Sequence, residues 1–257
     1  LPGASSALYG ANAFNGIMFM RSKNPFDHQG ISVSYKNGLT SQEAAGDNNY
    51  YDFNIRMAHA FSDKLAAKAT LSYLDGTEWY ATDYRNTNLS GVTTGDRATD
   101  NNYDGLNVYG DEVNANINDV AEKLELLGAI PTGESVSRTG YDESDLMSYD
   151  AKSMKFGASI NYRPFGDDRL EVIWNSKIGT GNTIYQGTNR YNIKNFFMEQ
   201  HKLELTGKNF FVRGYMTSED AGDSYDTRFA AININRAWKS DADWFGQYTG
   251  AFLGLIP

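Results

Sequence analysis

The sequence of 257 residues predicts an all-β fold, namely part of an antiparallel transmembrane β-barrel. Three observations predict it. Seven segments alternate between apolar and polar side chains, the connections between them alternate between short and long, and 14% of the residues are aromatic. The chain has no apolar run of about 18 residues, which excludes a transmembrane helix, whereas barrel strands need only half an apolar pattern. We expect about 7–8 strands of a larger barrel, with long extracellular loops.

The alternating segments each have an apolar face and a polar face. In the first of them, Ile31, Val33 and Tyr35 alternate with two serines and a lysine. The pattern occurs in residues 31–39, 51–61, 65–73, 153–162, 170–178, 202–206 and 210–217. Most of these strands have roughly 9–12 residues, the length that a tilted strand needs to cross a bilayer. A soluble β-sandwich shows the same alternation with its apolar face inside, so the alternation alone leaves both folds open.

The connections separate the two folds. Short turns are expected at residues 61–65, 163–169 and 206–209, and long segments at about 40–49, 75–150, 179–195 and from 218 onward. A transmembrane barrel has short turns at the periplasmic end and long loops outside. A sandwich has no reason to keep all its long loops at one end, so this arrangement favours the barrel.

The segment of residues 75–150 is too long for an ordinary loop and is predicted to be functional or partly folded. Within it, residues 118–128 have helical spacing, with Val120, Leu124 and Leu127 on one face. A small helix over the barrel mouth accounts for this spacing. Residues 229–244 do not alternate and are expected to hold another short helix.

One loop follows the spacing of calcium-binding loops. Oxygen-bearing residues stand at the first, third and fifth positions, Gly105 at the sixth and a carboxylate at the twelfth. The candidate ligands are Asp100, Asn102, Asp104, Leu106 through its carbonyl, and Asp111. The loop departs from the pattern in having Asp111 where glutamate is usual and Asn107 where an apolar residue is usual. An ordinary loop rich in Asn, Asp and Gly accounts for the same residues. Calcium in an extracellular loop is therefore a hypothesis, and no cofactor is required.

Composition argues against several other functions. The sequence has no cysteine, which excludes disulfides and thiolate metal sites. A formal net charge of −9 argues against nucleic-acid binding, because such a chain would repel a row of phosphates. The three histidines, His28, His59 and His201, are scattered, and no nucleophile, metalloprotease or phosphate-loop motif occurs. The sequence therefore predicts that the protein is not an enzyme.

The N-terminal residues carry a resemblance to a known family. Residues 6–17, Ser-Ala-Leu-Tyr-Gly-Ala-Asn-Ala-Phe-Asn-Gly-Ile, and then Arg21-Ser22-Lys23, closely resemble the end of the plug domain of TonB-dependent outer-membrane transporters. In that family a phrase of this type and a short apolar strand, here residues 17–20, close the plug, and the barrel begins directly after. The continuation Asn24-Pro25-Phe26 is most similar to receptors of the Bacteroidetes type.

The resemblance implies a division into residues 1–25, the C-terminal end of the plug, and residues 26–257, the first part of the barrel. It implies a piece of a longer protein in the outer membrane of a Gram-negative bacterium. The implied function is active uptake of a scarce nutrient, energised through the plug by the TonB–ExbB–ExbD system. Expected contacts are membrane lipid, lipopolysaccharide and an unknown nutrient ligand, and the resemblance leaves a surface lipoprotein partner open. A passive porin or adhesin barrel and a soluble carbohydrate-binding β-sandwich remain as alternatives.

Overall fold

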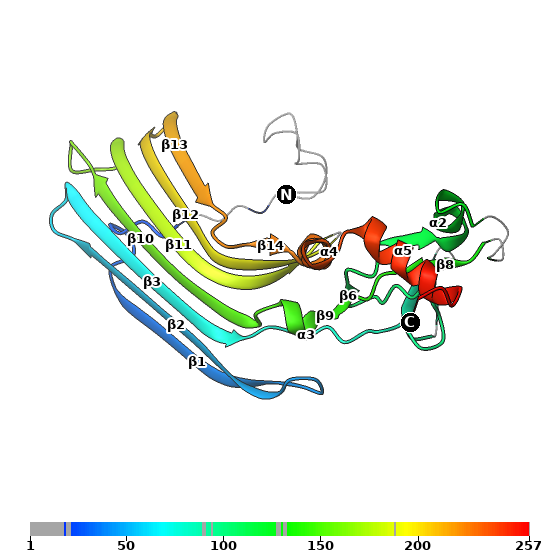
Figure 1. Cartoon of the computed structure of the whole chain (residues 1–257). Helices are drawn as coiled ribbons and strands as arrows, with labels where there is room; N and C mark the ends of the chain where they lie inside the picture. Colours follow the sequence, from blue (N-terminus) through cyan, green and yellow to red (C-terminus); the bar gives the residue numbers. More distant parts are fainter. Residues whose placement is uncertain are drawn as a thin grey trace.

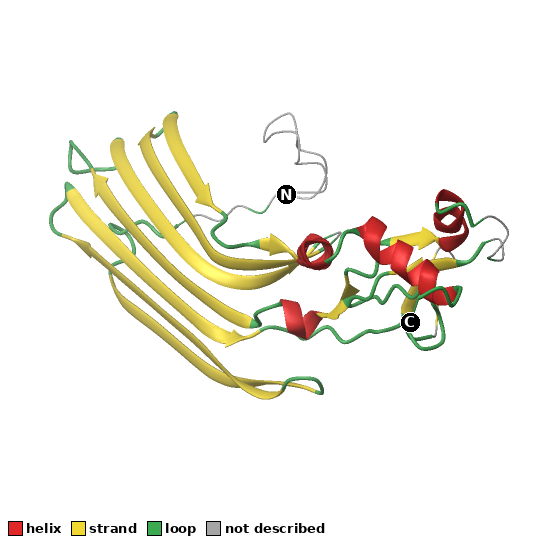
Figure 2. Cartoon of the chain, in the orientation of Figure 1, coloured by secondary structure: helices red, strands yellow, loops and turns green. Residues whose placement is uncertain are grey.

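The computed structural model describes residue 18 and residues 22–88, 91–93, 95–126, 130, 133–187 and 189–256. These residues form one large curved sheet and a smaller module of helices and short strands beyond one end of it (Figure 1, Figure 2). The plug-like phrase and most of the short strand predicted at residues 17–20 lie outside the described residues. No helix in the described part of the chain is long and apolar enough to span a membrane.

The large sheet has the order β1-β2-β3-β10-β11-β12-β13, and the two-residue strand β14 pairs with β12. All neighbours are antiparallel. The strands are β1 (Gly30–Gln42), β2 (Gly46–Ala60), β3 (Leu65–Thr77), β10 (Asp150–Tyr162), β11 (Leu170–Gln186), β12 (Arg190–Gly207), β13 (Phe211–Asp220) and β14 (Tyr225–Asp226). β1 and β13 are the edges, and in the described residues the sheet is not closed (Figure 1). The predicted all-β class, antiparallel pairing and number of strands are confirmed.

Two of the predicted long loops are wrong. β1 and β2 are joined by residues 43–45 alone, and β11 and β12 by residues 187–189, so both are tight hairpins. The strands continue past the apolar zone, because a ladder of backbone hydrogen bonds needs no apolar side chains. Leu39 pairs with Asn49 and Thr40 with Asn48 in a polar extension where no alternation can be read. Within the sheet, only the connection from β3 to β10 is long.

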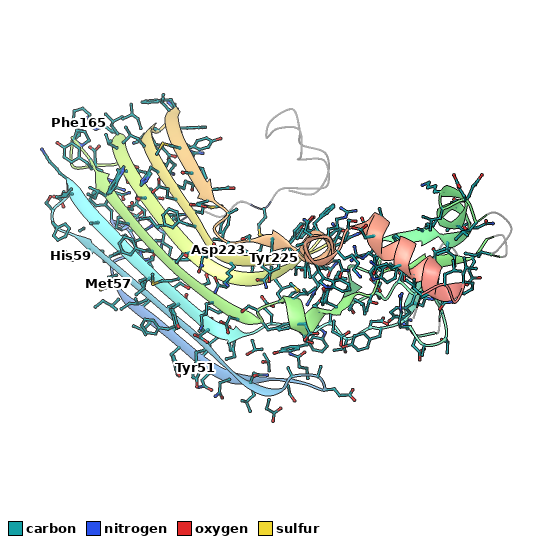
Figure 3. The ribbon with its side chains drawn as sticks, in the orientation of Figure 1. Tyr51, Met57, His59, Phe165, Asp223 and Tyr225 are labelled. Atoms are coloured by element: carbon teal, nitrogen blue, oxygen red, sulfur yellow. The ribbon has the colours of Figure 1, made fainter. Side chains whose placement is uncertain are left out.

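The two faces of the sheet differ sharply in exposure. The register places apolar side chains in rows across the sheet, for example Ile55 beside Leu71 and Leu71 beside Phe156. Leu71 is 37% exposed and Phe156 47% exposed, although both are flanked by other apolar residues. Tyr51 and Met57 lie on this outer face in Figure 3. No second sheet covers this face in the described fold, so the sandwich alternative has no counterpart here.

The opposite, concave face is polar and more crowded. Its buried residues are Ala58, Ala66, Lys68, Ser159, Asn161 and Glu171. Curvature brings side chains together on the inner side of a sheet and spreads them on the outer side, which explains why the polar residues are the less exposed ones. Residues 22–29 run within this curve before β1 begins (Figure 1).

The smaller module, called the loop module below, combines residues 78–149 with residues 221–256. It contains β4 (Asn86–Asn88), β5 (Gly91–Thr93), β6 (Val108–Tyr109), β7 (Asn114–Asn116), α2 (Ile117–Lys123), β8 (Ser135–Ser137), β9 (Tyr141–Asp142), α3 (Glu143–Leu146), α4 (Thr227–Trp238) and α5 (Asp241–Phe252). Three helices begin at side-chain caps, because Asn116, Asp226 and Ser240 each accept a backbone N–H of the first turn. The predicted partial folding of residues 75–150 is confirmed.

The apolar core of the loop module lies between α2 and α5. Ile117, Ala121, Ile130 and Val136 are buried, and Trp244 packs against them from α5. The helix predicted at residues 118–128 is confirmed but shorter, and its buried face is wrong: Ile117 and Ala121 point inward, while Leu124 is 48% exposed. Leu127 lies outside the described residues. The helix predicted at residues 229–244 is present as two helices, α4 and α5.

Arg138 holds the two parts of the module together. Its side chain is 1% exposed, and its guanidinium donates to Asp241 Oδ1 at 2.6 Å, to Lys239 O at 2.9 Å and to Asn235 O at 3.0 Å. These acceptors are the end of α4 and the start of α5. A single cation from the first long loop therefore fixes the turn between two C-terminal helices.

Candidate functional site

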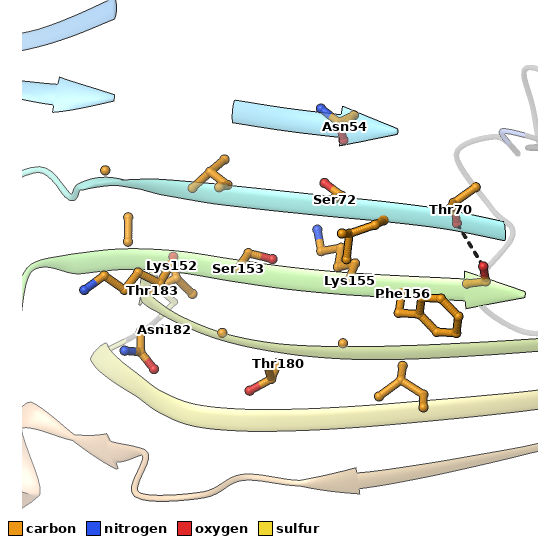
Figure 4. A pocket seen from close by; sticks show the side chains of 18 of the residues that line it. Asn54, Thr70, Ser72, Lys152, Ser153, Lys155, Phe156, Thr180, Asn182 and Thr183 are labelled. Atoms are coloured by element: carbon orange, nitrogen blue, oxygen red, sulfur yellow. Dashed lines mark hydrogen bonds between the residues drawn. The ribbon is translucent and has the colours of Figure 1, made fainter. Parts of the chain in front are cut away.

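The concave face of the large sheet forms a wide hollow. Its volume is about 1070 Å³, and β1, β2, β3, β10, β11 and β12 all contribute to its wall. Figure 4 shows polar side chains from neighbouring strands converging on it, among them Asn54, Thr70, Ser72 and Lys155. Such a concave surface with convergent polar groups is the default position for a ligand site.

Basic side chains gather on this face. The pairings of β2, β3, β10, β11 and β12 place five residues in one row across these strands. They are Arg56, Thr70, Gly157, Lys177 and Gln200. Lys155 lies two residues from Gly157 on the same face of β10. The charges of Arg56, Lys177 and Lys202 all act on the ammonium group of Lys68, so these cations are close together.

Two lysines of this face lie over glycines of neighbouring strands. A Cβ at Gly157 would contact Lys177 Cγ at 3.8 Å, and a Cβ at Gly179 would contact Lys155 Cγ at 3.6 Å. Each lysine therefore lies over a glycine of the neighbouring strand. Thr70 occupies the other side of Gly157, where its hydroxyl donates to Gly157 O at 3.4 Å (Figure 4).

The N-terminal segment is attached to this face. Lys68 Nζ donates to Ser22 Oγ and to Lys23 O, both at 2.7 Å. Pro25 is fully buried, and Phe26 lies under the guanidinium of Arg163 at 4.0 Å. The segment therefore reaches the concave face near the end of the sheet that holds the turns of residues 61–64 and 163–169, called the short-turn end below, and then leads into β1.

A buried carboxylate anchors the same segment. Glu171 is 5% exposed and accepts hydrogen bonds from Asn24 Nδ2 at 2.8 Å, Asn161 Nδ2 at 2.6 Å and Arg163 Nε at 2.9 Å. The cluster joins residue 24 to β10, β11 and the turn that connects them. Its charge is matched by Arg163, so it serves attachment and leaves no free charge for a ligand.

The candidate calcium loop lies in the loop module, where its residues are tied to other partners. Asp100 accepts from Asn86 and from the backbone N–H of Asn102, and Asp104 N donates to Asn86 Oδ1 at 3.1 Å. Leu106 donates its N–H to Arg85 O at 3.1 Å. In the described part of the chain, no group of three or more His, Asp or Glu is placed to hold a metal ion.

Two oxygens of this loop are buried and lack a hydrogen-bond partner within the described chain, Asn102 Oδ1 and Asp111 Oδ1. Asp111 Oδ2 accepts from Gly105 N at 2.9 Å. Burial raises the pKa of Asp111 to about 7 against the smaller effect of that hydrogen bond. Calcium binding stays a prediction that depends on these two oxygens.

The tyrosines of the loop module support its structure. Tyr109 and Tyr149 both donate to Glu143 at 2.9 Å, and Arg190 Nε lies 2.7 Å from the same carboxylate. Burial, and next the charge of Glu143, raise the pKa of both tyrosines. Tyr80 stacks on Tyr149 with ring centres 3.5 Å apart. This network joins the module to β12.

Sequence reasoning missed the basic cluster on the concave face. Its signal was present, since Lys68, Lys155 and Lys177 all occupy polar positions of alternating segments. To place these lysines together, one must know which strands are neighbours and in what register they pair. Comparison with protein-family models, with curated proteins and with solved structures found no match.

Proposed function

We propose that this chain is part of an outer-membrane transporter of the TonB-dependent class, in which the large sheet belongs to a closed transmembrane barrel. The observation that carries the proposal is the bare apolar outer face opposite a polar concave face. A water-soluble protein rarely exposes a contiguous apolar patch of this extent. Lipid would cover the outer face, and the polar face would line the interior.

The dimensions of the apolar face support this proposal. From Phe61 to Tyr51 the strand advances ten residues, about 33 Å, which at a tilt of about 40° is about 25 Å along the membrane normal. The apolar band of known outer-membrane barrels is also about 25 Å tall. Band height and strand length therefore agree with a bilayer.

Aromatic residues lie at both limits of the band. At the end nearer the loop module these are Tyr35, Tyr51, Phe53, Tyr73 and Phe197, and at the short-turn end Phe61, Tyr162, Phe165 and Phe210. Aromatic girdles at the two lipid–water interfaces are typical of membrane barrels. The asymmetry of the connections supports an orientation with the turns at residues 61–64 and 163–169 in the periplasm and the loop module at the cell surface.

The open edges of the sheet support a larger barrel. In hydrocarbon every backbone N–H and C=O needs a partner, so β1 and β13 would have to be paired in the membrane. Additional strands would complete the wall. A barrel of the TonB-dependent class has about 22 strands, of which this sheet would supply about a third.

The attachment of residues 22–26 supports a plugged transporter over a passive porin. The segment enters the concave side at the proposed periplasmic end, where the last residues of a plug would lead into the first barrel strand. Lys68, Glu171 and Arg163 hold it there. By the resemblance of residues 6–17, the TonB–ExbB–ExbD system would supply the energy and the external module would contact the nutrient.

Cysteine accessibility tests the membrane arrangement, since the chain contains no cysteine. Asp119→Cys lies on the exposed side of α2, and Asp167→Cys lies in a short turn. A membrane-impermeant maleimide should label Asp119→Cys on intact cells and Asp167→Cys only after the outer membrane is permeabilised. Labelling of both positions on intact cells would contradict the proposed orientation, and a protein recovered without detergent would refute the barrel.

Planar-bilayer recordings separate active transporter from porin. A plugged transporter should add no steady conductance, and removal of the chain up to Asn24 should open a channel. A steady conductance of the unaltered protein would favour the passive porin instead.

A further inference from the structure

We propose that a small hollow in the loop module binds an aliphatic diamine, with the carboxylates of Asp96, Asp111 and Asp142 as partners of its ammonium groups. All three residues belong to the loop module, so binding itself does not depend on a membrane. The inference rests on the proposed function only for its role, because it names the kind of solute that an external module would contact.

Several stretches of the module meet around this hollow. Its lining comes from Tyr84 and from residues 96–97, 103–111 and 139–142. The last two stretches are held together by the pairing of β6 with β9, in which Val108 lies opposite Asp142 (Figure 1). The volume of the hollow is about 330 Å³, near the lower limit for ligand pockets, so it suits a small solute.

Asp111 places a buried carboxyl group with one unused oxygen in the wall of this hollow. The residue is 1% exposed, and its Oδ2 accepts from Gly105 N at 2.9 Å. Its Oδ1 is buried and has no hydrogen-bond partner within the described residues. A buried oxygen without a partner is costly, so this atom indicates a donor that comes from a bound molecule.

Two further carboxylates line the hollow at exposed positions. Asp142 makes no side-chain hydrogen bond as the N-terminal cap of α3, and Asp96 Oδ1 accepts only from groups of its own turn. None of the three carboxylates forms an ion pair in the part of the chain that the structure describes. The exposed arginines of the module pair elsewhere, with Asp83, Glu112 and Asp241.

Arg97 is the single cation among the described lining residues, and backbone oxygens hold its guanidinium group. It donates to Ser137 O at 2.7 Å, and to Asn101 O and Arg138 O at 3.4 Å each. Three carboxylates against one guanidinium group leave two negative charges in the lining. A diamine carries the matching two positive charges.

The arrangement of the carboxylates favours an extended organic cation over a metal ion. Within the described ranges, no three acidic or histidine side chains are placed to hold one metal ion together. A diamine can reach separate carboxylates, because methylene groups join its two ammonium groups. Val108 and the rings of Tyr84 and Tyr103 supply apolar surface for the methylenes, and aromatic rings also attract ammonium groups.

The test is calorimetric titration of the intact protein in detergent micelles with 1,4-diaminobutane, in the presence of EGTA and about 50 mM salt, where screening is weak. The titration is made at pH 8, because burial raises the pKa of Asp111 to about 7. Asp111→Asn keeps an acceptor for Gly105 N but removes the charge, and should weaken binding about tenfold or more.

A pair of double variants separates the site from a general charge effect. Asp96→Asn/Asp142→Asn removes both exposed carboxylates of the hollow and should also weaken binding about tenfold. The control, Asp119→Asn/Glu122→Gln, removes the same charge from exposed positions of α2 outside the hollow and should leave the affinity unchanged. Equal weakening by both pairs would overturn the site, and this comparison decides alone if Asp111→Asn does not fold.

The choice of solute and the competing metal ion are tested in the same way. 1,4-Butanediol has the same length without the charges and should not bind; equal binding of the diol would overturn the proposal. An absence of diamine binding to the unaltered protein would overturn it too. If calcium then binds without EGTA and Asp111→Asn abolishes that binding, the unused oxygen belongs to a metal ion instead.

Membrane insertion is scored separately, by extraction of the protein from vesicles with alkali. A protein that inserts but does not bind the diamine refutes the diamine site alone. A protein that binds the diamine but stays soluble without detergent refutes the barrel.

Discussion

Replacing Met57 by arginine tests whether the outer face meets lipid. Met57 is 45% exposed and lies between Ile55 and His59 on that face, next to Ile31 of β1 and Ala69 of β3 (Figure 3). It is four residues from Phe61 and six from Tyr51, which places it about 10 Å and about 15 Å from the two aromatic limits at a strand tilt of about 40°.

At that depth an arginine facing lipid costs about 2–4 kcal/mol, whereas a substitution at an ordinary water-exposed position changes stability by less than about 0.5 kcal/mol. The two environments therefore differ by a measurable margin. The free energy of unfolding is measured for the intact protein in phospholipid vesicles by urea titration of tryptophan fluorescence. Met57→Arg should lower it by about 3 kcal/mol.

Two control variants separate lipid contact from other effects. Met57→Leu keeps the apolar surface and should change stability by less than about 1 kcal/mol. Asn54→Arg places the same new charge on the concave face of the same strand and should be tolerated. If Met57→Arg is as stable as Met57→Leu, the outer face does not meet hydrocarbon and the reasoning from the apolar band fails.

Three further predictions concern the loop module. Arg138→Met should destabilise the module by about 3 kcal/mol, because two carbonyls and a carboxylate lose a buried donor. Arg236→Met removes the exposed partner of the same carboxylate and should cost less than about 1 kcal/mol. Thermal unfolding followed by limited proteolysis compares the two variants. Burial raises the pKa of Asp111 to about 7. The stabilising contribution of the protonated carboxyl is therefore fully present below about pH 4 and is lost as pH rises through 7. The free energy of unfolding should fall over this range by up to about 4 kcal/mol. Asp111→Asn should remove that dependence, and hydrogen exchange of the module at pH 5 and pH 8 measures it; an equal pH dependence in the variant would contradict the assignment. If the loop of residues 100–111 binds calcium, calcium should protect it from proteolysis and EGTA should reverse the protection, whereas unchanged cleavage would refute the site.

Much of the large sheet could be predicted from local sequence. An alternation of period 2 follows directly from strand geometry, because successive side chains point to opposite faces. The alternation located all seven long strands and assigned their apolar and polar faces. The strand ends were misjudged wherever both faces are polar, as in residues 40–49 and 179–195, since backbone pairing leaves no side-chain signal there.

The helices show where local signals fail. The spacing of Val120, Leu124 and Leu127 indicates a helix, but the residue that the helix buries depends on what packs against it. α5 approaches from more than 100 residues away and covers Ile117 and Ala121 instead. The importance of Arg138 was likewise invisible, because its acceptors belong to α4 and α5.

The sequence by itself determined the class of fold and the two faces of the sheet, because both are properties of a few consecutive residues. Only the tertiary structure decided which strands are neighbours, and so which polar residues share a surface. Arg56, Lys155 and Lys177 come from three strands separated by up to about 120 residues of chain, and the antiparallel register alone brings them together. That none of the three makes an ion pair within the described residues could not be recognised before that register was known, because charge balance is a property of a surface in space.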